Sequence, residues 1–261
     1  MSLIYINPYS FAASAPWTPA DITTAFWLDA SDNATVFSDA GTTQAIAGTS
    51  TVQQWNDKSG NGRNVSQSTS GSRPNYLSAN INGKNVIDTG ASNWMQSTAT
   101  HNIGTTSVGA AVIKPNTLSF PNRDYITGGT SNSTNHILYL NASASRLELY
   151  SGAVVNGGTV LVAGISSIII GRTNGLSSSV RHNGTLLATG DGGSQNWTVN
   201  LNIGKSPGGA HTNSIYAEVV ILAGASDVST IEKLEGYLAW KWGLEGSLPA
   251  GHPYKSAAPT T

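Results

Sequence analysis

The sequence predicts an all-β protein, an antiparallel β-sandwich with one α-helix near the C-terminus. From Trp17 onward, short apolar-rich runs with a period of mostly two residues follow one another. Turn clusters rich in Gly and Asn separate these runs, which is typical of a sandwich or barrel and not of β-α-β units. Segment 229–242 breaks this pattern, because its apolar residues have helical spacing.

The strand predictions rest on apolar runs bounded by turn residues. One run contains Asn183-Gly184, which predicts a type I′ hairpin because both residues tolerate positive φ. The predicted runs are Val86–Asp88, Ser107–Ile113, His136–Leu140, Arg146–Tyr150, Val160–Val162, Ser166–Arg172, Ser179–Ala188, Val199–Gly204 and Ile215–Leu222.

The predicted helix carries an apolar stripe made by Ile231, Leu234, Leu238 and Trp242. Ser229 and Glu232 predict a capping box at its start, and Gly243 stands at the C-cap position. The preceding run, Ile215–Leu222, is apolar at nearly every position. We therefore expect this strand to be buried between its sheet and the helix.

Composition excludes several classes of protein. The chain has 261 residues, of which only 10% are charged, and its net charge is −1. This balance argues against a nucleic-acid partner, which needs a basic surface. The absence of cysteine excludes disulfides, thiolate metal sites and a cysteine nucleophile. We expect no export signal and no membrane insertion, because no basic start with an apolar run and no stretch of about 20 apolar residues is present.

We divide the chain into an N-terminal arm (1–16), one sandwich domain (17–245) and an extended C-terminal tail (246–261) that contains several prolines. The arm offers apolar side chains for docking, either on its own domain or on a partner. These anchors are Ile4, Tyr5, Ile6, Tyr9 and Phe11.

Segment 57–62 matches the first half of a calcium loop, with oxygen-bearing side chains at alternate positions and glycine at the turn. The closing glutamate is missing, because Ser68 stands at the twelfth position, so an EF-hand is excluded. A looser Ca²⁺ site would use Asp57 and Asn61. The alternative is a tight turn in which these side chains accept or donate backbone hydrogen bonds. No cofactor is otherwise required.

A sugar site needs an aromatic platform together with a few polar partners. Asn93 and Trp94 provide one candidate, and Trp197 provides another. A third is the polar loop that carries Asn132, Asn135 and His136. The alternatives are core packing for each Trp and a solvated surface for the loop.

The residues do not favour an enzyme. Glycoside hydrolysis needs two carboxyl groups at a defined separation. The five glutamates of this chain include no closely spaced pair on one strand, and Glu148 and Glu218 each stand alone in theirs. No nucleophile elbow or close histidine pair is present either.

Several blocks together resemble the concanavalin A-like (laminin-G-like) jelly-roll domains of phage virion proteins. They are FWLDAS (26–31), VQQWNDKSGNG (52–62), NGKNVID (82–88), YAEVVIL (216–222), EKLEGYLAWKWG (232–243) and LPAGHPY (248–254). The resemblance implies two sheets packed face to face. It also implies surface recognition by loops at one edge, commonly of glycans, without fixing the ligand.

On this basis we expect a non-enzymatic virion surface protein, assembled in the host cytoplasm, that binds host-surface or environmental glycans. The alternative is a capsid or tail decoration protein whose main ligand is another virion subunit, contacted by the arm. A glycan hydrolase on the same fold is a third hypothesis. Direct docking onto a particle would suit a homo-oligomer.

Overall fold

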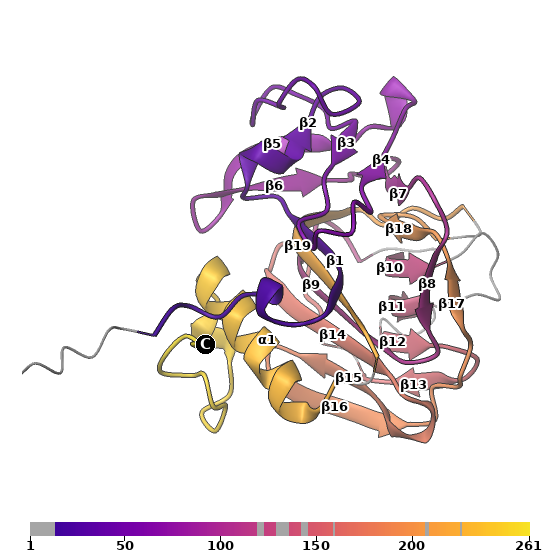
Figure 1. The fold of residues 1–261 in the computed structure, drawn as a ribbon, viewed down its shortest axis with the longest axis vertical. Coiled ribbons are helices and arrows are strands. Elements are labelled where there is room, and N and C mark those ends of the chain that lie inside the picture. The colour runs from indigo at the N-terminus through magenta and orange to yellow at the C-terminus, as the bar shows by residue number, and fades with distance from the viewer. Residues whose placement is uncertain are drawn as a thin grey trace, which may run out of the picture.

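The computed structural model describes residues 14–118, 123–128, 136–141, 146–158, 160–206, 209–224 and 226–261. Two antiparallel sheets face each other, and one helix, α1 (Val228–Trp242), covers the outer face of one sheet (Figure 1). The predicted antiparallel β-sandwich with one helix near the C-terminus is confirmed.

The first sheet has eight strands and carries the helix. Strand β19 (Ser214–Ala223) lies near its middle and pairs with β9, β6 and β1, all antiparallel. In spatial order seven of the strands are β16 (Thr185–Gly190), β15 (Ser178–His182), β14 (Ser167–Thr173), β9 (Ser107–Pro115), β19, β6 (Lys84–Asp88) and β5 (Asn75–Ile81). The eighth strand, β1 (Thr24–Asp29), pairs with β19 along the same edge as β6.

The second sheet has nine shorter strands. In spatial order they are β13 (Val154–Asn156), β12 (Arg146–Tyr150), β11 (His136–Asn141), β10 (Arg123–Gly128), β18 (Leu201–Ile203), β7 (Met95–Ser97), β4 (Val65–Ser66), β3 (Gln54–Trp55) and β2 (Val36–Phe37). Strands β8 (His101–Gly104) and β17 (Trp197–Val199) form a separate pair. Short 3-10 helices span Pro19–Asp21, Asn33–Thr35, Ser70–Ser72, Gly175–Ser177 and Glu245–Ser247.

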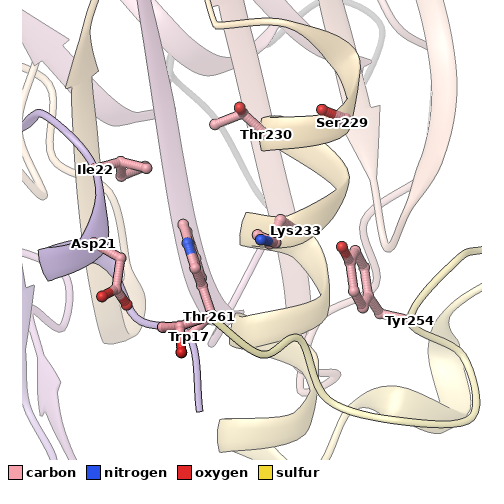
Figure 2. Close-up of a pocket in the computed structure, with 8 residues that line it drawn as sticks. All are labelled: Trp17, Asp21, Ile22, Ser229, Thr230, Lys233, Tyr254 and Thr261. Carbon is pink, nitrogen blue, oxygen red and sulfur yellow. The ribbon is translucent and has the colours of Figure 1, made fainter. Parts of the chain in front are cut away.

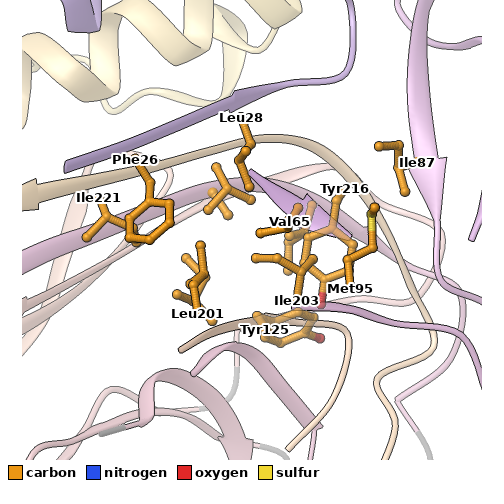
Figure 3. Packing of buried hydrophobic residues seen from close by; sticks show 14 of the residues in the cluster. Phe26, Leu28, Val65, Ile87, Met95, Tyr125, Leu201, Ile203, Tyr216 and Ile221 are labelled. Carbon is orange, nitrogen blue, oxygen red and sulfur yellow. The ribbon is translucent and has the colours of Figure 1, made fainter. Parts of the chain in front are cut away.

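The main core fills the space between the two sheets. Figure 3 shows side chains from both sheets meeting there, among them Phe26 and Ile221 from the first sheet and Leu201 and Ile203 from the second. All four are fully buried. Alternate strand positions supply these residues, because successive side chains in a strand point to opposite faces.

A second core lies between the first sheet and α1. Strand β19 contributes Ile215, Ala217, Val220 and Leu222 to it, and the residues that β19 directs into the main core are Tyr216, Val219 and Ile221. The helix contributes the stripe expected from the sequence. The prediction that the helix covers a strand buried on both faces is therefore confirmed.

The helix begins one residue earlier than expected and has a different cap. Asp227 is the N-cap, and its Oδ1 accepts a hydrogen bond from Thr230 N at 2.7 Å. The capping box expected from Ser229 and Glu232 is therefore wrong, because an acidic side chain two residues before Ser229 already satisfies the helix amide. Gly243 ends the helix at φ 65°, as predicted.

Two further local predictions had different outcomes. Asn183 and Gly184 have φ values of 47° and 79°, as the type I′ turn between β15 and β16 requires. The run Val160–Val162 is not a strand. Leu161 is buried in the main core, Val160 packs against that core, and Val162 is exposed. In the described part of the chain, no helix is long and apolar enough to span a membrane.

Candidate functional site

A cluster of charged side chains lies beneath α1, and the strand pattern places them there. Trp27 and Asp29 are two residues apart in β1, so both point toward the helix side of the first sheet. The register of β19 shifts between Tyr216 and Glu218, and this bulge turns Glu218 toward the same side. We call Asp29, Lys58, Glu218 and Lys241 the helix-anchoring cluster.

The distances within the cluster are short. Lys241 Nζ, from α1, lies 2.7 Å from Asp29 Oδ2 and 2.8 Å from Glu218 Oε2. Lys58 Nζ lies 3.0 Å from the same Asp29 oxygen and 2.7 Å from Asp32 Oδ2. Lys241 therefore joins β1 and β19, which are far apart in sequence, to the helix, and Lys58 joins its loop to the end of β1.

Glu218 is completely buried, and aromatic side chains surround it. Trp27 Nε1 donates to its Oε1 at 2.6 Å, and Tyr237 Oη donates to the same oxygen at 2.8 Å. Trp242 Nε1 donates to Oε2 at 2.6 Å. These donors compensate part of the cost of burying a carboxylate.

Burial and charge act in opposite directions on the acids of the cluster. Burial raises the pKa of Glu218 above its usual value, although the Lys241 charge opposes this effect. Burial also acts to raise the pKa of Asp29, but Lys241, Ser31 and Lys58 outweigh it and lower that pKa. Burial and the neighbouring Glu218 raise the pKa of Tyr237. Asp29 is therefore ionised, and Glu218 is the stronger base of the two.

The loop that carries Asp57 and Asn61 covers the outer edge of β1. Asp57 Oδ1 accepts hydrogen bonds from Trp27 N and Ser59 N, both at 2.9 Å, and its Oδ2 accepts one from Arg63 N at 3.1 Å. Asn61 Nδ2 donates to Thr24 O at 2.9 Å. These contacts match the turn alternative and cover an edge strand that would otherwise be exposed.

Calcium binding by this loop stays a proposal. Asp57 and Asn61 lie in one turn, but Asn61 directs its amide nitrogen toward β1. Within the described ranges, no group of three or more His, Asp or Glu side chains is placed to hold a metal ion.

A hollow of about 590 Å³ lies where the described ends of the chain meet α1 (Figure 2). Its lining combines aromatic rings, hydroxyl groups and two opposite charges. We call it the terminal hollow, and it is lined by Trp17, Asp21, Ile22, Ser229, Thr230, Lys233, Tyr254 and Thr261.

Backbone pairing of the two ends builds one side of the hollow. Trp17 N donates to Pro259 O at 3.0 Å, and Thr261 N donates to Ala15 O at 3.0 Å. Segment 246–261, expected as an extended tail, lies against the domain through buried residues such as Leu248 and His252. The tail thus brings Tyr254 and Thr261 to the helix.

The floor of the hollow is Trp17, which is only 4% exposed and packs edge-on against Tyr237 at a centroid distance of 6.0 Å. Asp21 is oriented by a capping box in which Thr18 N donates to its Oδ2 at 2.7 Å. Lys233 Nζ lies 5.9 Å from the Trp17 ring. Among the described residues, no carboxylate lies within 4.0 Å of this ammonium, so it can bind a ligand.

Tyr254 forms the aromatic wall of the hollow because a glycine in the helix lets it approach. A Cβ atom on Gly236 would come within 2.5 Å of Tyr254 Cβ. Trp240 Nε1 donates to Tyr254 O at 2.9 Å and fixes the backbone. Figure 2 shows the Tyr254 ring beside the helix, with Lys233 on the adjacent turn.

The sequence-predicted sugar residues do not meet in this hollow. Asn93 and Trp94 immediately precede β7, an interior strand of the second sheet, and Lys205 Nζ lies 4.1 Å from the centre of the Trp94 ring. The Lys205 ammonium therefore occupies one ring face. Trp197 is 1% exposed within the main core, so the structure assigns it to packing and not to a sugar platform.

The remaining predicted residues are only partly described. Asn132 and Asn135 lie outside the described residues, and only the backbone of His136, in β11, is placed. Ile203 pairs with both Met95 and Ile126, so β7 and β10 run in the same direction. Trp94 therefore lies at the start of these strands, whereas the last residue of β10, Gly128, lies at their opposite end. The arm anchors Ile4, Tyr5, Ile6, Tyr9 and Phe11 also lie outside the described residues.

The terminal hollow was missed from the sequence because its parts come from opposite ends of the chain. Trp17, Lys233 and Tyr254 share no local motif. The available signals were a glycine inside a predicted helix, which needs a packing reason, and an aromatic residue in the closing LPAGHPY block.

The sequence matches no protein-family model and no curated protein. The fold is similar to domain 4 of AbnA, an extracellular arabinanase from Geobacillus stearothermophilus, solved in complex with arabinotriose. The TM-score is 0.51 at 14% identity, and the match covers 67% of this chain and 90% of that domain.

Two larger proteins contain a similar fold. An α-L-arabinofuranosidase soaked with 4-nitrophenyl α-L-arabinofuranoside matches with a TM-score of 0.60 at 10% identity, over 83% of this chain and 62% of that one. Trypanosoma rangeli sialidase in complex with sialic acid matches with a TM-score of 0.53 at 13% identity, over 88% and 36%. This chain thus spans less than two thirds of either protein, and the likenesses show a shared β-sandwich fold.

Proposed function

We propose that this protein is a non-enzymatic glycan-binding module displayed on a phage particle, and that the terminal hollow holds the saccharide. The observation that carries the proposal is the lining of the hollow, which brings together aromatic rings, hydroxyl groups and the Lys233 ammonium. The blocks that resemble phage virion domains support the particle setting.

The hollow suits the chemistry of a sugar. The apolar face of a sugar ring can lie on Tyr254, which is half-buried and held by α1. Its hydroxyl groups can then reach Ser229, Thr230 and Lys233, which line the same hollow. The similar arabinanase domain, whose structure contains arabinotriose, supports a saccharide ligand.

The non-enzymatic part of the proposal rests on the acids. Asp21 is the one acidic side chain among the described lining residues, whereas glycoside hydrolysis ordinarily uses two acidic side chains. Asp29 and Glu218 converge on Lys241, but Glu218 is completely buried under α1.

The alternative is docking onto another virion subunit through the arm, whose residues 1–13 lie outside the described residues. The described chain begins beside the hollow, where Ala15 O accepts a hydrogen bond from Thr261 N. In this alternative the arm anchors named above contact the neighbouring subunit.

Binding of the full chain to a glycan array, followed by calorimetry with the best saccharide, tests the proposal. Arabinotriose and sialic acid serve as the first individual probes. We expect Tyr254→Ala and Lys233→Ala each to weaken binding about tenfold, which corresponds to about 1.4 kcal/mol. Trp94→Ala is the matched control, because it removes the aromatic residue of the rival site and should leave affinity unchanged. Binding that depends on Trp94 and not on Tyr254, or no saccharide binding, would overturn the proposal.

A further inference from the structure

The helix-anchoring cluster places an amine, a carboxyl group and a second acid within contact of one another. Lys241 Nζ lies 2.7 Å from Asp29 Oδ2 and 2.8 Å from Glu218 Oε2. The Lys241 amine can act as a nucleophile, the Asp29 carboxyl group as an electrophile and Glu218 as a proton carrier. No feature of the proposed glycan site uses them.

The three groups are largely buried, and aromatic rings lie around the Lys241 ammonium. The side chains of Asp29, Glu218 and Lys241 are 4%, 0% and 18% exposed. The ammonium lies 5.9 Å from the Trp27 ring, 5.4 Å from the Tyr237 ring and 5.7 Å from the Trp242 ring. Loss of water to form an amide is favoured where bulk water is excluded, and the same exclusion protects the product from hydrolysis.

We propose that Lys241 and Asp29 condense into an amide bond that covalently joins α1 to β1. The ammonium first gives one proton to the Glu218 carboxylate. The neutral Nζ then attacks Asp29 Cγ and forms the new C–N bond. The bond from Cγ to Oδ2 breaks, and Oδ2 leaves as water after receiving the proton held by Glu218 and a second proton from the nitrogen. One ammonium and one carboxylate become one amide and one water, and Glu218 returns to its initial state.

The contacts around Asp29 support this route. Ser31 N and Ser31 Oγ donate to Asp29 Oδ1 at 3.0 Å and 2.6 Å, and Lys58 Nζ contacts Oδ2 at 3.0 Å. These donors stabilise the negative charge that develops on oxygen when the nitrogen attacks. Oδ1 remains as the amide oxygen and keeps both Ser31 hydrogen bonds.

The fixed geometry replaces a bimolecular encounter. Reacting groups held in contact reach effective concentrations on the order of 10⁵–10⁸ M. The base that takes the proton is also well matched to its role. Because burial raises the pKa of Glu218, its carboxylate accepts a proton more readily than an exposed one would.

Lys58 contacts the same Asp29 oxygen but is not the nucleophile. Its second partner, Asp32, has a side chain that is 34% exposed, so Lys58 has no buried acid to take its proton. Lys58 therefore provides a matched control for Lys241.

Intact-mass measurement of the purified full chain under denaturing conditions tests the proposal. We expect the wild-type chain to be lighter than its sequence mass by one water molecule. Proteolysis should then release a branched peptide that contains both Asp29 and Lys241. Lys241→Arg should restore the full sequence mass of the variant, and Lys58→Arg should still lose one water. Glu218→Gln should slow or abolish the loss.

A wild-type chain that keeps its full mass after folding and several days of incubation would overturn the proposal and leave the cluster as an ion-pair network only. Loss of water that persists in Lys241→Arg would also overturn it, because dehydration at Asp191-Gly192 would give the same mass. Because the wild-type mass decides the question, a variant that fails to fold does not affect the result. Glycan binding is a separate measurement and can succeed or fail independently.

Discussion

Gly236 shows how a single residue can position a binding wall. Glycine inside a helix costs about 1 kcal/mol relative to alanine, so its presence needs a reason. The reason is the Tyr254 side chain, whose Cβ, Cγ and Cδ2 atoms would all lie within 3 Å of a Cβ at this position. The helix thus loses intrinsic stability in exchange for close contact with the tail.

Gly236→Ala is expected to lower both stability and saccharide affinity. Steric overlap with Tyr254 costs about 2 kcal/mol and exceeds the gain of about 1 kcal/mol in helix propensity, which leaves a net loss of about 1 kcal/mol. The melting temperature should therefore fall by about 2–4 °C. Gly246→Ala is the matched control, because a Cβ there meets no atom within 4 Å. An unchanged melting temperature for Gly236→Ala would contradict the packing argument.

His182 should make the protein less stable in mild acid. Burial lowers the pKa of His182 below its ordinary value of 6.5, so the folded state holds the neutral ring, whose Nε2 contacts Ser167 Oγ. The unfolded chain takes up a proton first as pH falls, so stability is complete above pH 6.5 and decreases toward the lowered pKa. Thermal unfolding at several pH values should show a smaller decrease for His182→Gln.

At the scale of elements, the cap of α1 tests how the helix is stabilised. Asp227 Oδ1 accepts hydrogen bonds from Thr230 N and from Ser229 Oγ, and its pKa is lowered by the first of these contacts. Asp227→Ala should therefore lower the urea midpoint more than Ser229→Ala does. A larger decrease in the urea midpoint for Ser229→Ala than for Asp227→Ala would instead support the capping box that the sequence predicts.

The loop over β1 gives a second prediction at this scale. Asp57→Ala should lower the melting temperature in the presence of a chelator, because Trp27 N and Arg63 N lose their acceptor. The calcium proposal adds a further effect, in which Ca²⁺ raises the melting temperature of the wild type but not of the variant. No rise at millimolar Ca²⁺ would leave the loop as a cover for the edge of β1.

Local signals predicted elements well, and long-range contacts were not predictable. Asn183-Gly184 and Gly243 act through their own backbone angles, so the sequence shows their roles directly. Lys241 and Asp29 meet only because β1 pairs with β19 and α1 lies over both, and no local pattern encodes that pairing. The same reason hid the terminal hollow.

At the scale of the whole molecule, the arm can be tested apart from the domain. Removal of residues 1–13 should leave the melting temperature unchanged, because Ala15 and Trp17 keep their hydrogen bonds to the tail. Removal of residues 1–17 should lower it, because Trp17 is buried against Tyr237. If the arm docks onto another virion subunit, the shorter deletion should also abolish incorporation into particles. Normal incorporation would contradict that alternative.

The hydrogen bond between Thr261 N and Ala15 O brings the two described ends of the chain to one spot on the surface. A short linker could therefore join them, and the polypeptide could be reopened elsewhere, for example within the exposed loop 162–165, without separating the paired strands described here. The same geometry would let the whole domain be inserted into a surface loop of an unrelated protein, because both connections to the host chain would lie close together.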